Sequence, residues 1–359
     1  MRKLVTLRTV NNITPIEGAD KIVSASIDGW NCIVKANEFK IGDVGVFFEV
    51  DSLIPLTDEF AFLKDKARKN HGGIIFNDLR IRIKTIRLKG VLSQGLLLPI
   101  SLFKDRIDFS AYDFESDLTE AFNVLKYEPK VLARLRGNAK GLFPSFIFKT
   151  DQERVQNLPK VYSMSIEKGL DYEVTLKMNG ASMTVFYQTV TGNNDNGVCS
   201  RNYQLELNQE NNHYCDIQKR DHIIERLIEY HAKTGKSYAV QGELVGVDIQ
   251  KNYEQFDTLQ FFVFDVFDIE EGKYLFPEER RKVVAELGLK HVPVIEEHFS
   301  LSTFNENTFM DEILKYADGK SINAPVREGV VFKSNQPHHG LSYSFKAISN
   351  IYLEKHDTD

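Results

Sequence analysis

Hydrophobic positions in the first third of the chain recur in short runs, separated by turns rich in Gly and Asp. Residues 44–50 and 95–99 have the apolar content of core strands, and Asp28-Gly29 and Gly42-Asp43 are typical turn pairs. Several short strands with turns at this spacing are typical of a small barrel of the OB type. We therefore predict an OB-like β-barrel that binds nucleic acid over residues 1–107.

The polar pattern of this part is clearest in residues 80–89. Arg80, Arg82 and Lys84 alternate with isoleucines, so their side chains are expected to share one face of a strand. The phase changes at Thr85, which indicates a bulge. Such a face is either the solvated exterior of the barrel or a stripe that follows an RNA backbone. The second interpretation makes Arg80, Arg82 and Lys84 candidate RNA-binding residues, with Ser93 and Gln94 adding hydrogen bonds.

Apolar runs become longer from residue 141 onward and alternate with amphipathic segments. The runs at 238–245 and 259–267 predict buried strands, and the patterns at 216–231, 277–287 and 305–319 predict helices. A further run at 174–187 predicts a strand, a tight corner at Lys177 and Gly180, and a second strand that runs back. The fold class is therefore α+β, with antiparallel sheets and flanking helices over residues 141–359.

The connection between these parts is predicted over residues 108–140. Its segment 118–135 is expected to contain a helix that is interrupted near Pro129. Thr150 or Asp151 is expected to cap a short helix that Pro159 closes.

Charged residues occur in or beside several of the apolar strands of the second part. A buried strand rarely tolerates a charge without a partner. Pairing with a neighbour would explain any one of these residues alone. Five of them, following the Lys177 corner, predict a single cleft instead: Glu243, Asp265, Glu328, Lys333 and Lys346.

Composition narrows the class of protein. The 359 residues are 42% hydrophobic and 27% charged, as in globular proteins with two domains. Residues 1–106 carry 17 Lys and Arg against 12 Asp and Glu, whereas the remainder carries 28 against 39. This asymmetry suits a phosphate-backbone contact made by the first part. We expect a soluble, intracellular, cytoplasmic monomer without a membrane partner, because no apolar run could span a bilayer, the N-terminus lacks a signal-peptide pattern and three cysteines cannot all pair.

The second part contains six short motifs in a fixed order. They are Lys177-Met-Asn-Gly180, Ser200-Arg-Asn202, Gly242-Glu-Leu244, 261–265, Glu328-Gly-Val-Val-Phe-Lys333 and Ser344-Phe-Lys346. Together they resemble the motifs of the covalent nucleotidyltransferase superfamily of polynucleotide ligases and RNA-capping enzymes. The segment 143–146 and the OB-like first part resemble more closely the ATP-dependent RNA ligases of the Naegleria type, in which an OB domain precedes the transferase.

This resemblance implies a lysyl-AMP mechanism that uses ATP and Mg²⁺ or Mn²⁺. Lys177 would attack ATP, and the adenylate would pass to an RNA 5′-phosphate, which a 3′-hydroxyl then attacks. The expected substrate is a nick in duplex RNA, and the expected role is RNA repair. The implied roles are metal binding by Glu243, Glu328 and Asn179, phosphate contact by Lys333 and Lys346, and nucleotide or RNA-end binding by Gly180, Arg201, Asn202 and Phe264, with Phe262 as the alternative to Phe264.

Two departures from the family pattern keep other functions open. Asn179 stands where Asp is usual, and Ser344 stands where Lys is common. The alternatives are a DNA ligase, an RNA-capping guanylyltransferase, or a catalytically silent OB-fold RNA-binding protein. The spacing of His213, Cys215, His222 and Cys199 matches no standard zinc pattern, and no phosphate-loop motif is present.

Overall fold

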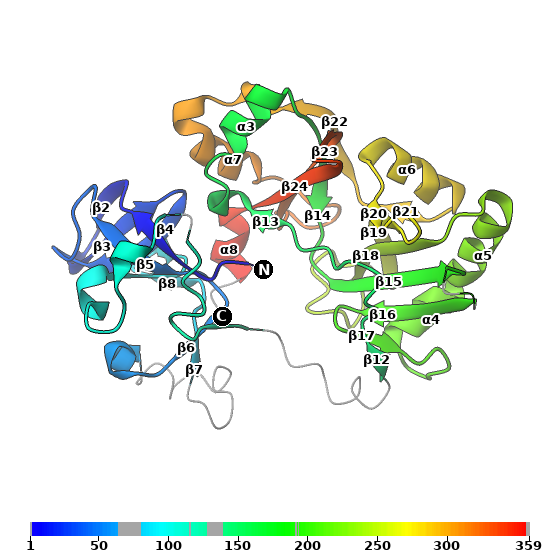
Figure 1. Cartoon of the computed structure of the whole chain (residues 1–359), viewed down its shortest axis with the longest axis horizontal. Coiled ribbons are helices and arrows are strands. Elements are labelled where there is room, and N and C mark those ends of the chain that lie inside the picture. The colour runs from blue at the N-terminus through cyan, green and yellow to red at the C-terminus, as the bar shows by residue number, and fades with distance from the viewer. Residues whose placement is uncertain are drawn as a thin grey trace. The chain divides into compact units, whose positions relative to one another are not determined.

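The computed structural model describes residues 2–63, 80–114, 116–127, 139–190, 192 and 194–356. The chain divides into two compact units, which are described separately: Met1–Lys130 with Leu353–Asp359, and Val131–Tyr352. Figure 1 colours both units by residue number.

The first unit consists of short antiparallel strands around an aromatic core. Its sheets have the orders β1-β5-β10, β2-β3-β4, β11-β6-β7 and β8-β9. Phe48, Phe60, Phe103 and Phe122 are fully buried and contact one another ring to edge or tilted. The elements are β1 (Val5–Thr9), β2 (Asn12–Ile16), β3 (Ala19–Ile27), β4 (Trp30–Lys35), β5 (Val44–Phe48), β6 (Ser52–Pro55), η1 (Asp58–Leu63), β7 (Arg80–Arg82), β8 (Ile86–Leu88), β9 (Val91–Ser93), β10 (Leu96–Pro99), η2 (Ile100–Phe103), η3 (Phe109–Ala111) and β11 (Leu125–Lys126).

The basic residues of β7 do not form the shared exposed face that their alternation predicts. Arg80 is only 3% exposed and donates hydrogen bonds to two backbone carbonyls. Arg82 bonds through its Nε to the Asp51 carboxylate at 2.9 Å and lies over the Tyr127 ring. Lys84 is partly exposed and follows the end of β7. The prediction is therefore wrong for Arg80, because its guanidinium satisfies carbonyl groups inside the unit.

Ser93 and Gln94 also have structural contacts. The Ser93 hydroxyl accepts a hydrogen bond from the Ile33 amide at 3.0 Å, and the Gln94 amide donates to the Asn31 carbonyl at 2.6 Å. Both side chains are buried. These bonds join β4 to Ser93, the last residue of β9, and to Gln94, which follows it.

The connection contains no helix between residues 118 and 127, because a turn and β11 occupy this described stretch. The rest of the expected helix, over residues 128–135, lies outside the described residues.

The second unit is built on two sheets. An eight-stranded sheet has the order β12-β17-β16-β15-β18-β19-β20, with β21 also pairing with β19, and a five-stranded sheet has the order β13-β24-β23-β14-β22. The elements are β12 (Ala139–Leu142), β13 (Glu153–Arg154), η4 (Val155–Asn157), α3 (Val161–Lys168), β14 (Asp171–Lys177), β15 (Ala181–Gln188), β16 (Asp195–Ser200), β17 (Tyr203–Leu205), α4 (His213–Arg220), α5 (Ile223–Thr234), β18 (Tyr238–Val245), β19 (Gln260–Asp268), β20 (Lys273–Tyr274), α6 (Pro277–Glu286), β21 (Lys290–His291), β22 (Val294–Ser300), η5 (Leu301–Thr303), η6 (Glu306–Thr308), α7 (Phe309–Tyr316), β23 (Gly329–His338), β24 (Leu341–Ile348) and α8 (Asn350–His356).

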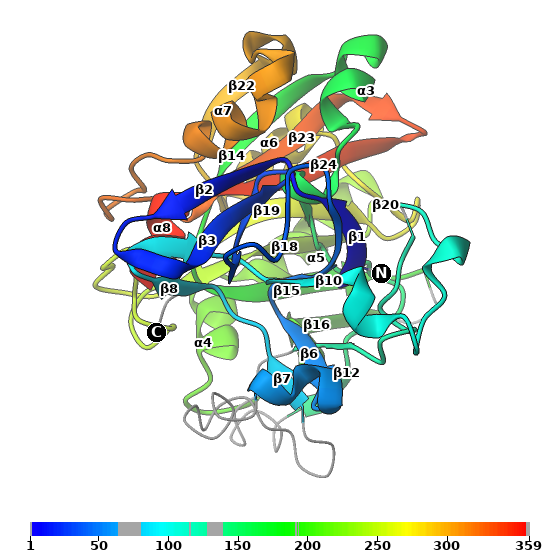
Figure 2. The same ribbon diagram turned by 90° about the vertical axis from the view of Figure 1, so that its left-hand side faces the viewer.

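Helices cover the outer faces of both sheets. Helices α4 and α5 pack on the eight-stranded sheet through Ile217, Ile224 and Leu227 (Figure 1). Helices α3 and α7 lie beside the five-stranded sheet in both views, with Phe309 and Ile313 in its core (Figures 1 and 2). The predicted α+β fold with antiparallel sheets and flanking helices is confirmed.

The corner after Lys177 differs from its prediction. Strand β14 pairs with β22 and β23, whereas β15 pairs with β16 and β18, so the two strands belong to different sheets. The expected second strand running back against the first is therefore wrong, and the corner instead carries the chain from one sheet to the other. A Cβ atom added to Gly180 would lie 2.4 Å from the Leu244 carbonyl oxygen, so the corner requires glycine for this close approach.

Helices elsewhere also deviate locally from the sequence pattern. The single helix expected over 216–231 is divided into α4 and α5 at His222, whose φ is 51°. The helix expected before Pro159 is reduced to the 3₁₀ turn η4, which begins after Arg154 rather than at Thr150 or Asp151. No helix among the described residues is long and apolar enough to cross a membrane.

Candidate active site

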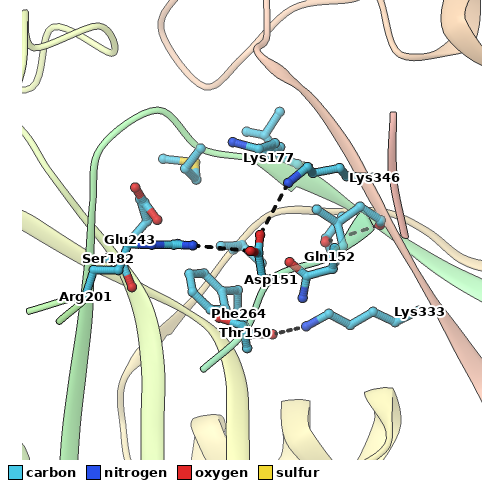
Figure 3. A pocket seen from close by; sticks show the side chains of 15 residues that line it. Thr150, Asp151, Gln152, Lys177, Ser182, Arg201, Glu243, Phe264, Lys333 and Lys346 are labelled. Atoms are coloured by element: carbon cyan, nitrogen blue, oxygen red, sulfur yellow. Dashed lines mark hydrogen bonds and ion pairs between the residues drawn. The ribbon is translucent and has the colours of Figure 1, made fainter. Parts of the chain in front are cut away.

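A cleft in the second unit receives side chains from both sheets (Figure 3). It encloses about 700 Å³ of empty space, including solvent at its mouth. The five-stranded sheet supplies residues of β14, β23 and β24, and the eight-stranded sheet supplies residues of β15, β18 and β19. The lining consists of Thr150, Asp151, Gln152, Thr175, Leu176, Lys177, Met178, Ser182, Arg201, Glu243, Phe264, Val292, Val331, Lys333 and Lys346.

Lys177 occupies the last position of β14, where the chain leaves the five-stranded sheet. Its backbone pairs with Gly329, and its amine donates a hydrogen bond to the carboxylate of the adjacent Glu328. The two side chains remain 25% and 16% exposed, respectively. The amine therefore faces a cleft that has room for a ligand, and a carboxylate is in direct contact with it.

Glu243 lies across the cleft on β18, opposite Ser182 of β15. Burial raises the pKa of the Glu243 carboxyl to about 8, and nearby Glu328 adds to this rise, while Lys177 and Arg201 oppose it. Two neighbouring carboxyl groups that are largely removed from water do not readily both ionise unless a cation lies beside them.

Oxygen donors at this point fit a hard divalent cation. Mg²⁺ is commonly held by one or two carboxylates and retains several waters. Glu243 and Glu328 supply two carboxylates, and Asn179 donates through Nδ2 to the Tyr352 hydroxyl at 2.7 Å, so its amide is oriented by a fixed partner. The described residues hold no group of three or more His, Cys, Asp and Glu suited to a metal.

Strand register gives the spacing along the five-stranded sheet. Lys177 pairs with Gly329, Val331 pairs with Lys346, and Lys333 pairs with Ser344. Because a strand rises about 3.3 Å per residue, Lys346 begins about 7 Å and Lys333 about 13 Å from the level of Lys177. The two lysines thus start at different levels of the cleft, with Lys333 farther from Lys177 than Lys346 is.

Lys333 is held firmly in the interior. Its amine lies 2.5 Å from the Asp265 carboxylate and 2.7 Å from the Phe264 carbonyl oxygen. Burial lowers the pKa of Lys333 to about 8, and Asp265 opposes this shift. The amine is therefore fixed to β19 of the opposite sheet.

The two candidate phenylalanines of β19 have different surroundings. Phe264 lines the cleft together with Val292 and Val331, whereas Phe262 is buried and stacks on Phe256 at a centroid distance of 5.9 Å. Phe264 is thus the aromatic side chain that a ligand in the cleft can reach.

Arg201 lines the cleft and contacts Asp151, a residue whose role the sequence did not indicate. The Asp151 carboxylate lies 3.5 Å from the Arg201 guanidinium and 3.8 Å from the Lys346 amine (Figure 3). Asn202 accepts a hydrogen bond from Lys149 at 3.0 Å beside the cleft. A phosphate group also accepts charge-assisted hydrogen bonds, so it could replace the Asp151 carboxylate as the partner of Arg201 and Lys346.

Thr150, Gln152 and Ser182 were also missed by sequence reasoning. The segment 150–152 carries the pattern of a helix cap, and it lies in the cleft because β13 pairs in parallel with β24. That pairing joins residues far apart in the sequence and has no local signal.

Two units with these features, a small barrel and a two-sheet unit with a lysine corner, define an OB-fold domain joined to a nucleotidyltransferase-type domain. An OB-fold domain family matches residues 4–100, and the RNA ligase family matches residues 170–348. Among curated protein sequences, none matches the chain.

Solved structures of Naegleria gruberi RNA ligase are similar over the whole chain. A mutant form with AMP and Mn is 38% identical, covers 100% of both chains and has a TM-score of 0.83. A form with ATP and Mn is 38% identical with a TM-score of 0.82, covering 99% of this chain and 100% of that one, and the form with PPi is 38% identical with a TM-score of 0.81, covering 100% of both. The chain therefore belongs to the RNA ligase family, and the predicted resemblance and OB-fold are confirmed.

Proposed function

We propose that this enzyme is an ATP-dependent RNA ligase that joins 3′-hydroxyl and 5′-phosphate ends through adenylated Lys177. The observation that carries the proposal is the position of the Lys177 amine, at the corner between two sheets, facing a cleft and bonded to Glu328. The ATP, AMP and PPi bound by the Naegleria relative are the substrate, adduct component and product that such a reaction requires.

In the first step the Lys177 nitrogen forms a bond to the α-phosphorus of ATP, and the bond to the leaving pyrophosphate breaks. An ordinary lysine amine is almost fully protonated at neutral pH and must lose a proton before it can attack. Glu328 accepts the hydrogen bond from Lys177 and holds its amine at the cleft. A carboxylate beside an amine favours the ammonium form, so the groups that would favour loss of the proton are Lys346 and a divalent cation when bound.

Charge on the α-phosphate is met by side chains near the corner. Lys346 begins two residue positions from the level of Lys177 along the sheet and lines the same cleft. Mg²⁺ or Mn²⁺ held by Glu243, Glu328 and Asn179 would neutralise phosphate oxygens when bound. The same carboxylates orient Lys177 through the contact with Glu328.

The base of the nucleotide fits farther along the cleft, between Phe264 and the strand residues Thr175 and Val331. The Lys333 amine, at the far end of the cleft from Lys177, donates a hydrogen bond to a nitrogen of the base ring that has a free lone pair. Adenine N1 is an acceptor, whereas guanine carries a proton there, so this contact favours ATP over GTP. We thus assign Lys333 to the base instead of the phosphate.

In the later steps the adenylate moves to an RNA 5′-phosphate, and a 3′-hydroxyl then attacks that activated phosphate and releases AMP. Arg201 and Asn202, beside the cleft, are the candidates for the 5′-phosphate, because Arg201 already pairs with the Asp151 carboxylate. We assign residues 1–107 to RNA binding, 141–359 to adenylyl transfer and 108–140 to their connection. The RNA contacts of the first unit are assigned to Lys84 and Arg82. A nick in duplex RNA, as in repair, supplies both ends at one place.

The test is incubation of the protein with Mg²⁺ and α-labelled ATP or, separately, α-labelled GTP, followed by denaturing electrophoresis. An acid-labile label from ATP is expected, and the labelled protein should then seal a nicked RNA duplex without added ATP. Label from GTP alone would replace the proposal with a capping activity. Absence of any label, with Mn²⁺ also tried and bound AMP excluded by mass, would leave an RNA-binding protein.

A further inference from the structure

Four buried charged side chains form a continuous chain beside the base end of the cleft. They come from four elements: Glu173 from β14, Asp265 from β19, Arg280 from α6 and Lys333 from β23. The set holds two carboxylates and two cations, so its charges balance, as a buried cluster requires.

Arg280 is the member that contacts the others from outside the sheets. It donates through Nη2 to the Glu173 carboxylate and through Nε to the His291 Nε2 at 3.1 Å, and its Nη1 lies 3.8 Å from the Asp265 Oδ1. Burial lowers the pKa of His291 to about 3, so its ring is neutral and accepts this bond. The same Asp265 oxygen lies 2.5 Å from the Lys333 amine.

This arrangement fixes Asp265 from two sides. Arginine presents its donors in a rigid planar fork, so the bonds to Glu173 and His291 determine where the third nitrogen points. That nitrogen, Nη1, has no hydrogen-bond partner among the described residues, and its nearest carboxylate is Asp265. Asp265 therefore lies between two cations and holds one of them, Lys333, at a defined point.

We propose that Arg280 is a positioning residue that, anchored by Glu173, fixes Asp265 and so sets the Lys333 amine at the base end of the cleft. Helix α6 and both sheets then define together the point that selects the nucleotide base. This inference rests on the proposed function, in which the base of ATP lies against Lys333.

The test compares Arg280→Lys with a matched control on the same helix, Arg281→Gln. Lysine keeps the charge that balances Glu173 and removes the fork. Arg281 also bonds to Glu173, but its other bond runs to Glu297 and its side chain is 24% exposed. The readouts are single-turnover labelling at increasing ATP and inhibition of that labelling by unlabelled GTP.

Arg280→Lys is expected to raise the KM for ATP about 10-fold and to reduce the preference for ATP over GTP, with the maximal labelling rate changed less than about 3-fold. Arg281→Gln should keep both values within about 2-fold of wild type. A variant Arg280→Lys with the KM and preference of wild type would overturn the proposal.

A double variant separates positioning from general weakening of the unit. If Arg280 acts through Lys333, adding Arg280→Lys to Lys333→Met should change the KM less than about 2-fold, since the amine that it positions is gone. Equal effects of Arg280→Lys in both backgrounds would overturn the proposal.

Should thermal melting show that Arg280→Lys is unfolded, Asp265→Asn carries the same test. The amide keeps the shape of Asp265 and removes the charge that joins Arg280 to Lys333, so the KM and the GTP preference should shift as above. Unchanged values would overturn the proposal. Failure of wild type to form an adduct with ATP would instead reject the proposed function itself.

Discussion

Two lysines on the same face of the five-stranded sheet each contact a carboxylate, and the surroundings of the two pairs differ. Lys177 and Glu328 are 25% and 16% exposed, at the corner where the chain changes sheet, whereas Lys333 and Asp265 are 6% and 5% exposed. A ligand can separate the first pair at small cost, because water and substrate reach it. The second pair is dry, and leaving either charge alone there is expensive. This contrast supports a reactive role for Lys177 and a fixed, base-contacting role for Lys333.

The largest expected effect is that of Lys177→Met. Without the amine no covalent adduct can form, so labelling by α-labelled ATP should fall at least about 10³-fold, while RNA binding measured by gel shift persists. Lys168→Met, on exposed α3, is the matched control and should be labelled as well as wild type. Label retained in Lys177→Met would assign the nucleophile to another residue.

Lys333→Met should lower stability in addition to raising the KM for ATP. It leaves the buried Asp265 with Arg280 as its remaining cation, 3.8 Å away, so the free energy of unfolding in urea at pH 7 should fall by about 3 kcal/mol. A loss below about 1 kcal/mol would show that Arg280 or water satisfies Asp265 without Lys333.

The pH dependence of the same pair of proteins sharpens this prediction. Burial lowers the pKa of Lys333 from 10.5 to about 8, so between these values the unfolded chain binds more protons than the folded one. The free energy of unfolding therefore rises with pH between about 8 and 10.5. The full contribution of the lowered pKa is present above pH 10.5 and is lost as the pH falls through about 8. The advantage of wild type over Lys333→Met should therefore rise by up to about 3 kcal/mol between pH 7.5 and 10.5. A constant difference would contradict the buried cation.

Phe264→Ala and Phe262→Ala make the same comparison within β19, between a side chain that lines the cleft and one that is buried. Phe264→Ala should raise the KM for ATP about 10-fold, since stacking on a base contributes about 1–3 kcal/mol. Phe262→Ala should leave the KM within about 2-fold and lower the free energy of unfolding by about 3 kcal/mol, because it empties a packed site. The reverse pattern would move the base to the other side of β19.

Much of the second unit could be predicted because its signals are local. The apolar run 238–245 coincides with β18, and the acidic residue within it, Glu243, does reach the cleft with Lys177. The family motifs of this unit are short and follow one another in a fixed order along the chain. They were therefore sufficient to predict that Lys177, Glu243 and Lys346 line one cleft.

The remainder depended on pairings between distant segments. A strand, a glycine corner and a second strand have the same local pattern whether they form a hairpin or change sheets, and only the pairing of β14 with β23 decides. Asp151 lies in the cleft because β13 pairs with β24, a strand that is also far away in the sequence. Arg80 alternates like a surface residue, yet its carbonyl partners are contributed by segments elsewhere in the first unit.

The smallest expected effect concerns the first unit, where a partly exposed cation, Lys84, can be compared with a buried one, Arg80. Lys84→Gln should weaken binding to nicked RNA about 3-fold and reduce the slope of log affinity against log salt by about 1, without changing self-adenylation. Arg80→Gln should lower the free energy of unfolding by about 1–3 kcal/mol, since carbonyls lose their donor, and leave the salt slope unchanged. A reduced slope in Arg80→Gln at wild-type stability would place Arg80 on the RNA after all. If only Lys84 alters the slope, exposure rather than strand alternation identifies the cations of this unit that meet phosphate.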